Sequence, residues 1–160
     1  MEFFHRTGGP RAIVLRYTNV YGPRQDPHGE AGVVAIFIQQ MLKGQTPTIF
    51  GDGKQTRDFV YVKDVAEANL LAAHRDIDGI FNIGTGKETN VNTLASLLAD
   101  ATGYTGGFDY QPARPGEQLR SVVDPSKAKE VLGFSPRISI EEGLRQTVHY
   151  FKQKALEKCE

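Results

Sequence analysis

Apolar residues recur along this chain with two spacings, which predict a mixture of strands and helices. Short apolar and β-branched runs, bounded by Gly, Pro, Asn or Asp, are typical of strands. Apolar positions three and four residues apart are typical of helices. The strands expected on this basis are 11–17, 46–50, 57–62, 79–83 and 108–110, and the helices are 31–42, 65–74, 91–102, 125–132 and one from 140 onward.

Local capping signals support several of these helix boundaries. Asn90 can cap the helix at 91–102, and Asp124 stands directly before a proline, which suits a first helical position. Residues 139–142, with the sequence Ser-Ile-Glu-Glu, form a capping box for the final helix. Residues 1–7 are typical of a helix tail. Because a helix this short is unstable alone, we expect that something upstream has been lost.

The order of these elements predicts an α/β protein without strict β–α–β alternation. Such a pattern suits part of a sheet with a small additional α/β lobe better than a complete doubly wound domain. A chain of 160 residues has the length of one ordinary domain, so we treat residues 1–160 as a single portion.

Charge and composition exclude several classes of partner. Lys and Arg together number 19, as do Asp and Glu, so no net field attracts nucleic acid or an acidic membrane surface. No apolar run approaches the ~20 residues that span a bilayer, and we expect no membrane contact. The single cysteine, Cys159, and the lack of a signal-peptide stretch favour a cytoplasmic location. The four histidines show no metal-ligand spacing, so no metal site is expected.

The first candidate site follows the strand at 11–17, where Arg16, Asn19 and Arg24 lie close in sequence. Ligands of open α/β sheets bind at the carboxyl ends of the strands. An asparagine there can donate its amide to a phosphate or a sugar hydroxyl. A plain turn, in which Asn19 serves only the backbone, explains this segment equally well.

Two further candidate sites each contain an arginine. Arg57 follows a glycine-rich turn and offers a planar fork of donors for phosphate oxygens, while Phe50 could stack on a base. The alternative is an ordinary turn, with Phe50 in the core and Arg57 paired with its neighbour Asp58 or solvated. Arg114 could complete a diphosphate clamp, and Glu117 could accept hydrogen bonds from ribose hydroxyls. A solvated Arg114–Glu117 pair is the alternative there.

Residues 84–89, with the sequence Gly-Thr-Gly-Lys-Glu-Thr, do not form a phosphate loop. A P-loop needs glycine where Phe81 stands, and Ser or Thr where Glu88 stands. The dinucleotide fingerprint needs a glycine where Thr89 stands. We therefore expect a strand-to-helix turn.

Taken in order, these segments resemble the extended short-chain dehydrogenases, in particular the NAD-dependent sugar-nucleotide epimerases and dehydratases. The matching stretches are Leu-Arg-Tyr-Thr-Asn-Val-Tyr-Gly-Pro at 15–23, Ile-Phe-Gly-Asp-Gly-Lys-Gln-Thr-Arg-Asp-Phe-Val-Tyr-Val at 49–62, Phe-Asn-Ile-Gly-Thr-Gly at 81–86, Arg-Pro-Gly-Glu at 114–117 and Asp-Pro-Ser-Lys-Ala at 124–128. The UDP-glucose 4-epimerase group is the most similar. The resemblance implies the C-terminal portion of an extended Rossmann-type fold, with late sheet strands, a small α/β substrate-binding lobe and no N-terminal NAD-binding part.

The resemblance also implies roles for individual positions. For a UDP-sugar substrate these are Asn19 at the diphosphate or hexose, Val33 and Val34 with their backbone against the diphosphate, Phe50 beside the base, Arg57 and Arg114 on the diphosphate, and Glu117 on the ribose. For the cofactor NAD the implied position is Tyr17, near the nicotinamide. No catalytic residue is carried over.

The resemblance implies an enzyme whose tyrosine takes a proton while NAD takes a hydride. We expect no counterpart here of the family's glycine-rich phosphate turn, ribose-binding acid, active-site Ser or Thr, or Tyr-x-x-x-Lys pair. The chain is therefore expected to be the inactive substrate-binding part of a UDP-glucose 4-epimerase-like enzyme. Its partners would be a missing N-terminal half and, as is common in the family, a second subunit. The alternatives are a stand-alone nucleotide-sugar-binding module, or part of a dehydratase or decarboxylase.

Overall fold

The computed structural model describes residues 12–28 and 32–157 of the 160-residue chain. Its strands are β1 (Ile13–Tyr17), β2 (Asn19–Tyr21), β3 (Thr48–Phe50), β4 (Thr56–Arg57), β5 (Phe59–Tyr61), β6 (Gly79–Ile83), β7 (Thr89–Asn90), β8 (Asp109–Gln111) and β9 (Arg120–Ser121). Its helices are α2 (Val33–Leu42), α3 (Val62–Ala73), α4 (Val91–Thr102), the short π-helical segment η1 (Ala128–Leu132) and α5 (Ile140–Leu156). The mixed α/β class expected from the sequence is confirmed. The helix tail expected at 1–7 and Cys159 lie outside the described residues.

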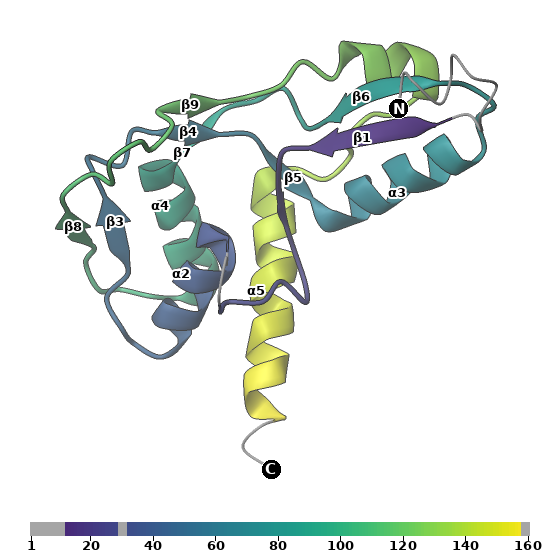
Figure 1. Ribbon diagram of the computed structural model, residues 1–160. Coiled ribbons are helices and arrows are strands. Elements are labelled where there is room, and N and C mark those ends of the chain that lie inside the picture. Colours follow the sequence, from purple (N-terminus) through teal and green to yellow (C-terminus); the bar gives the residue numbers. More distant parts are fainter. Residues whose placement is uncertain (1–11, 29–31, 158–160) are drawn as a thin grey trace.

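Strand β5 separates two hydrophobic clusters. All of its residues are buried, and they alternate, because Phe59 and Tyr61 belong to the first cluster and Val60 to the second. The first cluster lies among α2, α4 and α5, and the second lies among α3, β6 and η1 (Figure 1). Successive side chains of a strand point to opposite faces, so one short strand contributes to both cores.

Parallel pairing brings distant segments to one edge. β2 pairs with β5 in parallel, with Asn19 opposite Phe59. β4 lies between β7 and β9 and ends at Arg57, only two residues before Phe59. Asn19 lies opposite Phe59, and Arg57 precedes Phe59 by two residues. The fold therefore brings Asn19 and Arg57, which are far apart in the sequence, close to the same strand, β5.

The structure differs from the sequence predictions mainly in the strands. Between the expected strand at 11–17 and the expected helix at 31–42, where no element was predicted, the structure contains β2, which forms because β5 offers it a parallel partner. The strand expected at 57–62 is divided at Asp58, and α3 begins at Val62 instead of position 65. β7 and β9 have two residues each, too few for a periodic signal in the sequence.

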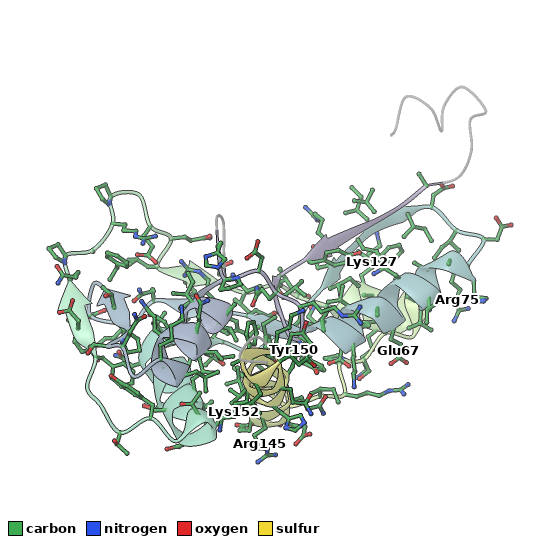
Figure 2. All side chains as sticks on the ribbon, turned by 90° about the horizontal axis from the view of Figure 1, so that it is seen from below. Glu67, Arg75, Lys127, Arg145, Tyr150 and Lys152 are labelled. Atoms are coloured by element: carbon green, nitrogen blue, oxygen red, sulfur yellow. The ribbon has the colours of Figure 1, made fainter. Side chains whose placement is uncertain are left out.

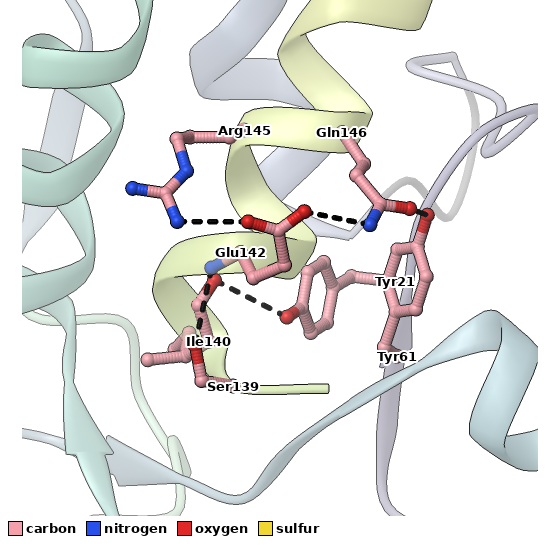
Figure 3. A network of polar contacts seen from close by, with 7 residues as sticks. All are labelled: Tyr21, Tyr61, Ser139, Ile140, Glu142, Arg145 and Gln146. Carbon is pink, nitrogen blue, oxygen red and sulfur yellow. Dashed lines mark hydrogen bonds and ion pairs between the residues drawn. The ribbon is translucent and has the colours of Figure 1, made fainter. Parts of the chain in front are cut away.

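The predicted helix boundaries are mostly confirmed. α4 covers the expected 91–102, and the side chain of Asn90 caps it. Ser139 Oγ accepts a hydrogen bond from the Glu142 N–H at 3.2 Å, as the capping box predicts. The reciprocal half of the box is wrong, because the Glu142 carboxylate accepts hydrogen bonds from two side chains one turn further along α5 (Figure 3).

Two buried tyrosines hold β2 and β5 against α5. Tyr21 Oη donates to the Ile140 carbonyl at 3.4 Å, and Tyr61 Oη donates to Gln146 Oε1 at 2.9 Å (Figure 3). Burial is the largest cause that raises the pKa of both tyrosines, and neighbouring acidic groups raise it further. Both hydroxyls therefore stay protonated, and the strands next to Asn19 and Arg57 keep a fixed position.

Within the described ranges, no helix is long and apolar enough to cross a membrane. The same ranges hold no group of three or more His, Cys, Asp or Glu side chains placed to bind a metal ion.

Candidate functional site

Most of the predicted substrate residues meet around one cleft of about 610 Å³. Those that line it are Asn19, Val33, Phe50, Arg57, Arg114 and Glu117. They come from β2, α2, β3, β4 and the loop between β8 and β9. The fold thus joins in one cleft residues that the sequence carries on five separate segments.

Arg57 is fixed by hydrogen bonds inside the protein. Its Nη1 donates to the carbonyl oxygens of Thr56 at 2.8 Å and Gln118 at 2.7 Å, and its Nη2 lies 3.5 Å from Glu117 Oε1. The Arg57 side chain is only 18% exposed. The alternatives from the sequence, an Arg57–Asp58 pair and a solvated Arg57, are therefore wrong. A planar guanidinium held in this way presents its remaining donors in a set direction.

Arg114 covers the ring of Phe50. Its Cζ lies 3.9 Å from the ring centroid, which is a cation–π stack. Gln55 Nε2 donates to the Phe50 carbonyl at 2.8 Å and holds this strand end in place. Glu117 pairs with Arg57. The Arg114–Glu117 pair that their closeness in the sequence suggested is not the pair that forms. A base could reach the covered face of Phe50 only by displacing Arg114, or it could stack on the guanidinium instead.

Val34 and Tyr17 are not among the residues that line this cleft. Val34 is 1% exposed and belongs to the first hydrophobic cluster, so only its backbone is left for the predicted diphosphate contact. Tyr17, at the end of β1, lines a different cleft, where its Oη donates to Asn69 Oδ1 at 2.9 Å. Both assignments stay predictions.

The glycine loop after β6 is filled by a carboxylate of the protein itself. Asp58 is fully buried and accepts hydrogen bonds from Thr85 N at 2.9 Å, Thr85 Oγ1 at 2.6 Å and Gly86 N at 3.0 Å. A Cβ at Gly84 would lie 2.6 Å from Asp58 Oδ2, so glycine is needed for this close approach. The amides that could cradle a phosphate are already used. This loop therefore does not fit the diphosphate of NAD, in agreement with the predicted turn.

A Tyr-x-x-x-Lys spacing does occur in this chain, on α5, but the expectation that the family's active-site pair has no counterpart here stays a prediction. Tyr150 and Lys154 carry it on α5, and Lys154 Nζ lies 3.5 Å from Tyr150 Oη. Residues four apart on a helix meet on its surface. Neither residue lines the cleft, and Tyr150 lies on α5 near Lys152 (Figure 2). The pair is a contact of the helix surface.

Sequence reasoning missed two glutamines of the cleft wall. One wall is a stripe of α2 made of Val33, Ile36, Phe37 and Gln40. The helical spacing of this stripe is visible in the sequence, and Gln40 is the polar member of an apolar row. Gln55 carries no such signal, because only its contact with Phe50 gives it a role.

A model of the NAD dependent epimerase/dehydratase family matches residues 1–84. A curated relative, the putative UDP-glucose 4-epimerase of Methanocaldococcus jannaschii, is 51% identical over 152 residues, which are 95% of this chain and 49% of that protein. The chain spans about half the length of the curated relatives that it matches.

Solved structures agree with this similarity. The UDP-glucose 4-epimerase of Thermotoga maritima, solved with UDP-glucose, superposes with a TM-score of 0.94 at 55% identity, over 96% of this chain and 50% of that one. The UDP-glucose 4-epimerase of Thermus thermophilus, solved with NAD, superposes with a TM-score of 0.85 at 43% identity, over 94% of this chain and 50% of that one. The expected portion of an extended Rossmann-type fold is thereby confirmed.

Proposed function

Because the chain belongs to the NAD-dependent epimerase/dehydratase family, we propose that its cleft binds a UDP-sugar, as the substrate-binding part of a nucleotide-sugar epimerase similar to UDP-glucose 4-epimerase. The observation that carries this proposal is the convergence of Phe50, Arg57, Arg114 and Glu117 on one cleft. A nucleoside diphosphate needs cations for its phosphates, an apolar surface for its base and acceptors for its ribose hydroxyls. These side chains supply each kind of group.

The two arginines bind the diphosphate in this proposal. Arg57 is already oriented by the carbonyl oxygens that it contacts, so it loses little side-chain entropy when it binds an anion. Arg114 rests on Phe50, and it either leaves this ring for a phosphate or stays and stacks on the base. In both arrangements the positive charge of Arg114 stays inside the cleft.

The remaining cleft residues contact the sugar parts of the ligand. Glu117 accepts from the ribose hydroxyls, and its ion pair with Arg57 keeps the carboxylate in the cleft wall. Asn19, at the start of β2, donates its amide to the diphosphate or the hexose. The backbone of Val33 and Val34 at the beginning of α2 lies against the diphosphate.

NAD is the cofactor that the family implies, and when bound it supplies the hydride acceptor of the reaction. We assign Tyr17 as a contact near the nicotinamide. Residues 84–86 hold no cradle for the NAD diphosphate, because Asp58 fills this loop. We therefore propose that residues 1–160 form a substrate-binding portion that does not epimerise alone, and that works with a dinucleotide-binding half in a homodimer.

A calorimetric titration of the purified chain tests the proposal. UDP-glucose is the ligand, and GDP-mannose and NAD are the controls. Saturable binding of UDP-glucose alone supports a UDP-sugar cleft that forms within this chain. No binding of any of the three ligands would contradict binding by this chain on its own.

The variants Arg57→Ala and Arg114→Ala test the diphosphate contacts. Each is expected to weaken UDP-glucose binding by about 1.5–3 kcal/mol, the range for a hydrogen bond to a charged group. Arg145→Ala is the matched control, because this arginine lies on α5 outside the cleft and its side chain is 66% exposed. Unchanged affinity in both cleft variants would refute the clamp, and urea denaturation checks that Arg57→Ala still folds.

A further inference from the structure

One buried polar atom of the cleft wall lacks a hydrogen-bond partner within the part of the chain that the structure describes. Gln40 Oε1 is shielded from solvent and accepts no hydrogen bond from the described residues. Among the described residues, Gln25 Oε1 is the other buried atom without a partner, but Gln25 does not line the cleft. Because an unpaired buried acceptor is unfavourable, a ligand that brings a donor to Gln40 gains from it.

The surroundings of Gln40 set it apart. Its neighbours in the α2 stripe, Val33, Ile36 and Phe37, are apolar. The other wall glutamine, Gln55, already donates to the Phe50 carbonyl. Gln40 therefore adds a single amide with unused hydrogen-bonding capacity to an apolar helix face.

We propose that Gln40 reads the base of the ligand by pairing its carboxamide with the imide edge of a pyrimidine such as uracil, an inference that rests on the proposed function. An imide places an N–H donor beside a carbonyl acceptor, and a carboxamide offers the complementary acceptor and donor side by side. The last torsion of a glutamine side chain is broad and roughly two-fold, so Oε1 can turn into the cleft. The pairing gives Oε1 the donor that it lacks.

The base fits this position better than the sugar. A flat pyrimidine suits the apolar stripe of α2 and the ring of Phe50. The hydroxyl-rich and anionic parts of the ligand suit the charged side chains, Arg57, Arg114 and Glu117. Gln40 is therefore assigned to the imide N–H and not to a sugar hydroxyl.

A pair of variants on one helix tests this assignment. Gln40→Met keeps the length of the side chain and removes the amide, while Gln39→Met makes the same change at a neighbour that does not line the cleft. The ligands are UDP and UDP methylated at N3 of uracil, which lacks the imide donor. The dissociation constants are measured by calorimetry, and urea denaturation followed by circular dichroism confirms that each variant folds.

The unaltered chain is expected to bind UDP about tenfold more tightly than N3-methyl-UDP, the effect of one lost hydrogen bond that leaves a buried group unpaired. Gln40→Met should lose this preference through weaker UDP binding, and Gln39→Met should keep it. Because Met matches Gln in length, a purely steric preference would persist in Gln40→Met and overturn the assignment. An effect of Gln40→Met on UDP-glucose that is absent with UDP would assign the atom to a sugar hydroxyl and overturn it too.

The outcomes also separate this inference from the proposed function. If the unaltered chain binds neither UDP nor UDP-glucose, the proposed cleft fails and the role of Gln40 fails with it. If the unaltered chain binds UDP and the preference survives in Gln40→Met, only the role of Gln40 is overturned.

Discussion

Gly143 on α5 lies directly against the buried tyrosines. A Cβ at this position would overlap Tyr21 Oη and would lie 3.0 Å from Tyr61 Cδ2. Alanine normally stabilises a helix interior by ~1 kcal/mol relative to glycine. Here the overlap dominates, so we expect Gly143→Ala to lower the free energy of unfolding by about 1–3 kcal/mol, as overpacking does. Urea denaturation followed by circular dichroism measures the change.

Gly107→Ala is the control for this prediction. No atom lies within 4 Å of a Cβ built at Gly107, so its stability should change little. A Gly143→Ala protein as stable as the Gly107→Ala protein would show that α5 can shift away from β2. The packing of Tyr21 would then not be rigid.

Glu88 links three strands, one of which, β4, carries the cleft residue Arg57. Its Oε1 accepts from Arg120 Nε at 2.8 Å and its Oε2 accepts from Thr56 Oγ1 at 2.6 Å, so β4 and β9 are tied to the residue before β7. The hydrogen bonds from Arg120, and then from Thr56, hold the pKa of Glu88 below its usual value. The loop with Arg114 and Glu117 ends at β9, so this link helps to place it.

The pH dependence of stability tests this link. An unfolded glutamate titrates near pH ~4.3, and the folded Glu88 titrates lower, so the unfolded state binds more protons between the two values. The contribution of Glu88 is therefore present above pH ~5 and is lost as the pH falls through the folded pKa. We expect Glu88→Gln to have a lower urea midpoint than the unaltered chain at pH 7, and the gap to close towards pH 3.

The comparison of the Glu88→Gln variant with the unaltered chain provides its own control. Other carboxylates with lowered pKa are present in both and cancel in the difference, namely Asp52, Asp124, Glu141 and Glu142. A gap that stays constant from pH 7 to pH 3 would mean that the charge of Glu88 contributes nothing to stability. The surface exposure of Arg120 would then be the reason.

The two hydrophobic clusters of the molecule differ in size. Among the residues that the structure describes, the first contains 14 buried residues and the second contains 8. β1, at the side of the second cluster, pairs only with β6 among the described strands. Regions with less burial and fewer paired edges open at lower free energy.

Native-state hydrogen exchange tests this difference. The amides of β1 and β6 are expected to exchange through smaller openings than those of α4, which packs in the first cluster. Low concentrations of urea should accelerate exchange in α4 only through global unfolding. Equal opening free energies in β1 and α4 would show that both clusters unfold as one unit.

Helices were easier to predict from the sequence than strands. Asn90 and Ser139 cap their helices as predicted, because a cap depends on residues within one turn. β2 and β9 exist only because partners elsewhere in the chain pair with them. Their short segments have no periodicity of their own.

In the candidate site too, local features could be predicted from the sequence and contacts between distant segments could not. Residue types and their order indicated Arg57, Arg114, Glu117 and Phe50, but not their contacts. The sequence suggested Arg57 beside Asp58 and Arg114 beside Glu117. The structure pairs Arg57 with Glu117, 60 positions away, and stacks Arg114 on Phe50.

The α/β class, most of the helix boundaries and the order of motifs that identifies the family follow from the sequence alone, because local periodicity, capping chemistry and residue identity are properties of the chain itself. Tertiary packing was needed to show that Asp58 fills the glycine loop, that Val34 is buried in the core, and that Gln40 Oε1 has no hydrogen-bond partner among the described residues. Each of these depends on which distant segments pack together, and a hydrogen bond or a buried surface exists only after that packing has brought both partners into contact.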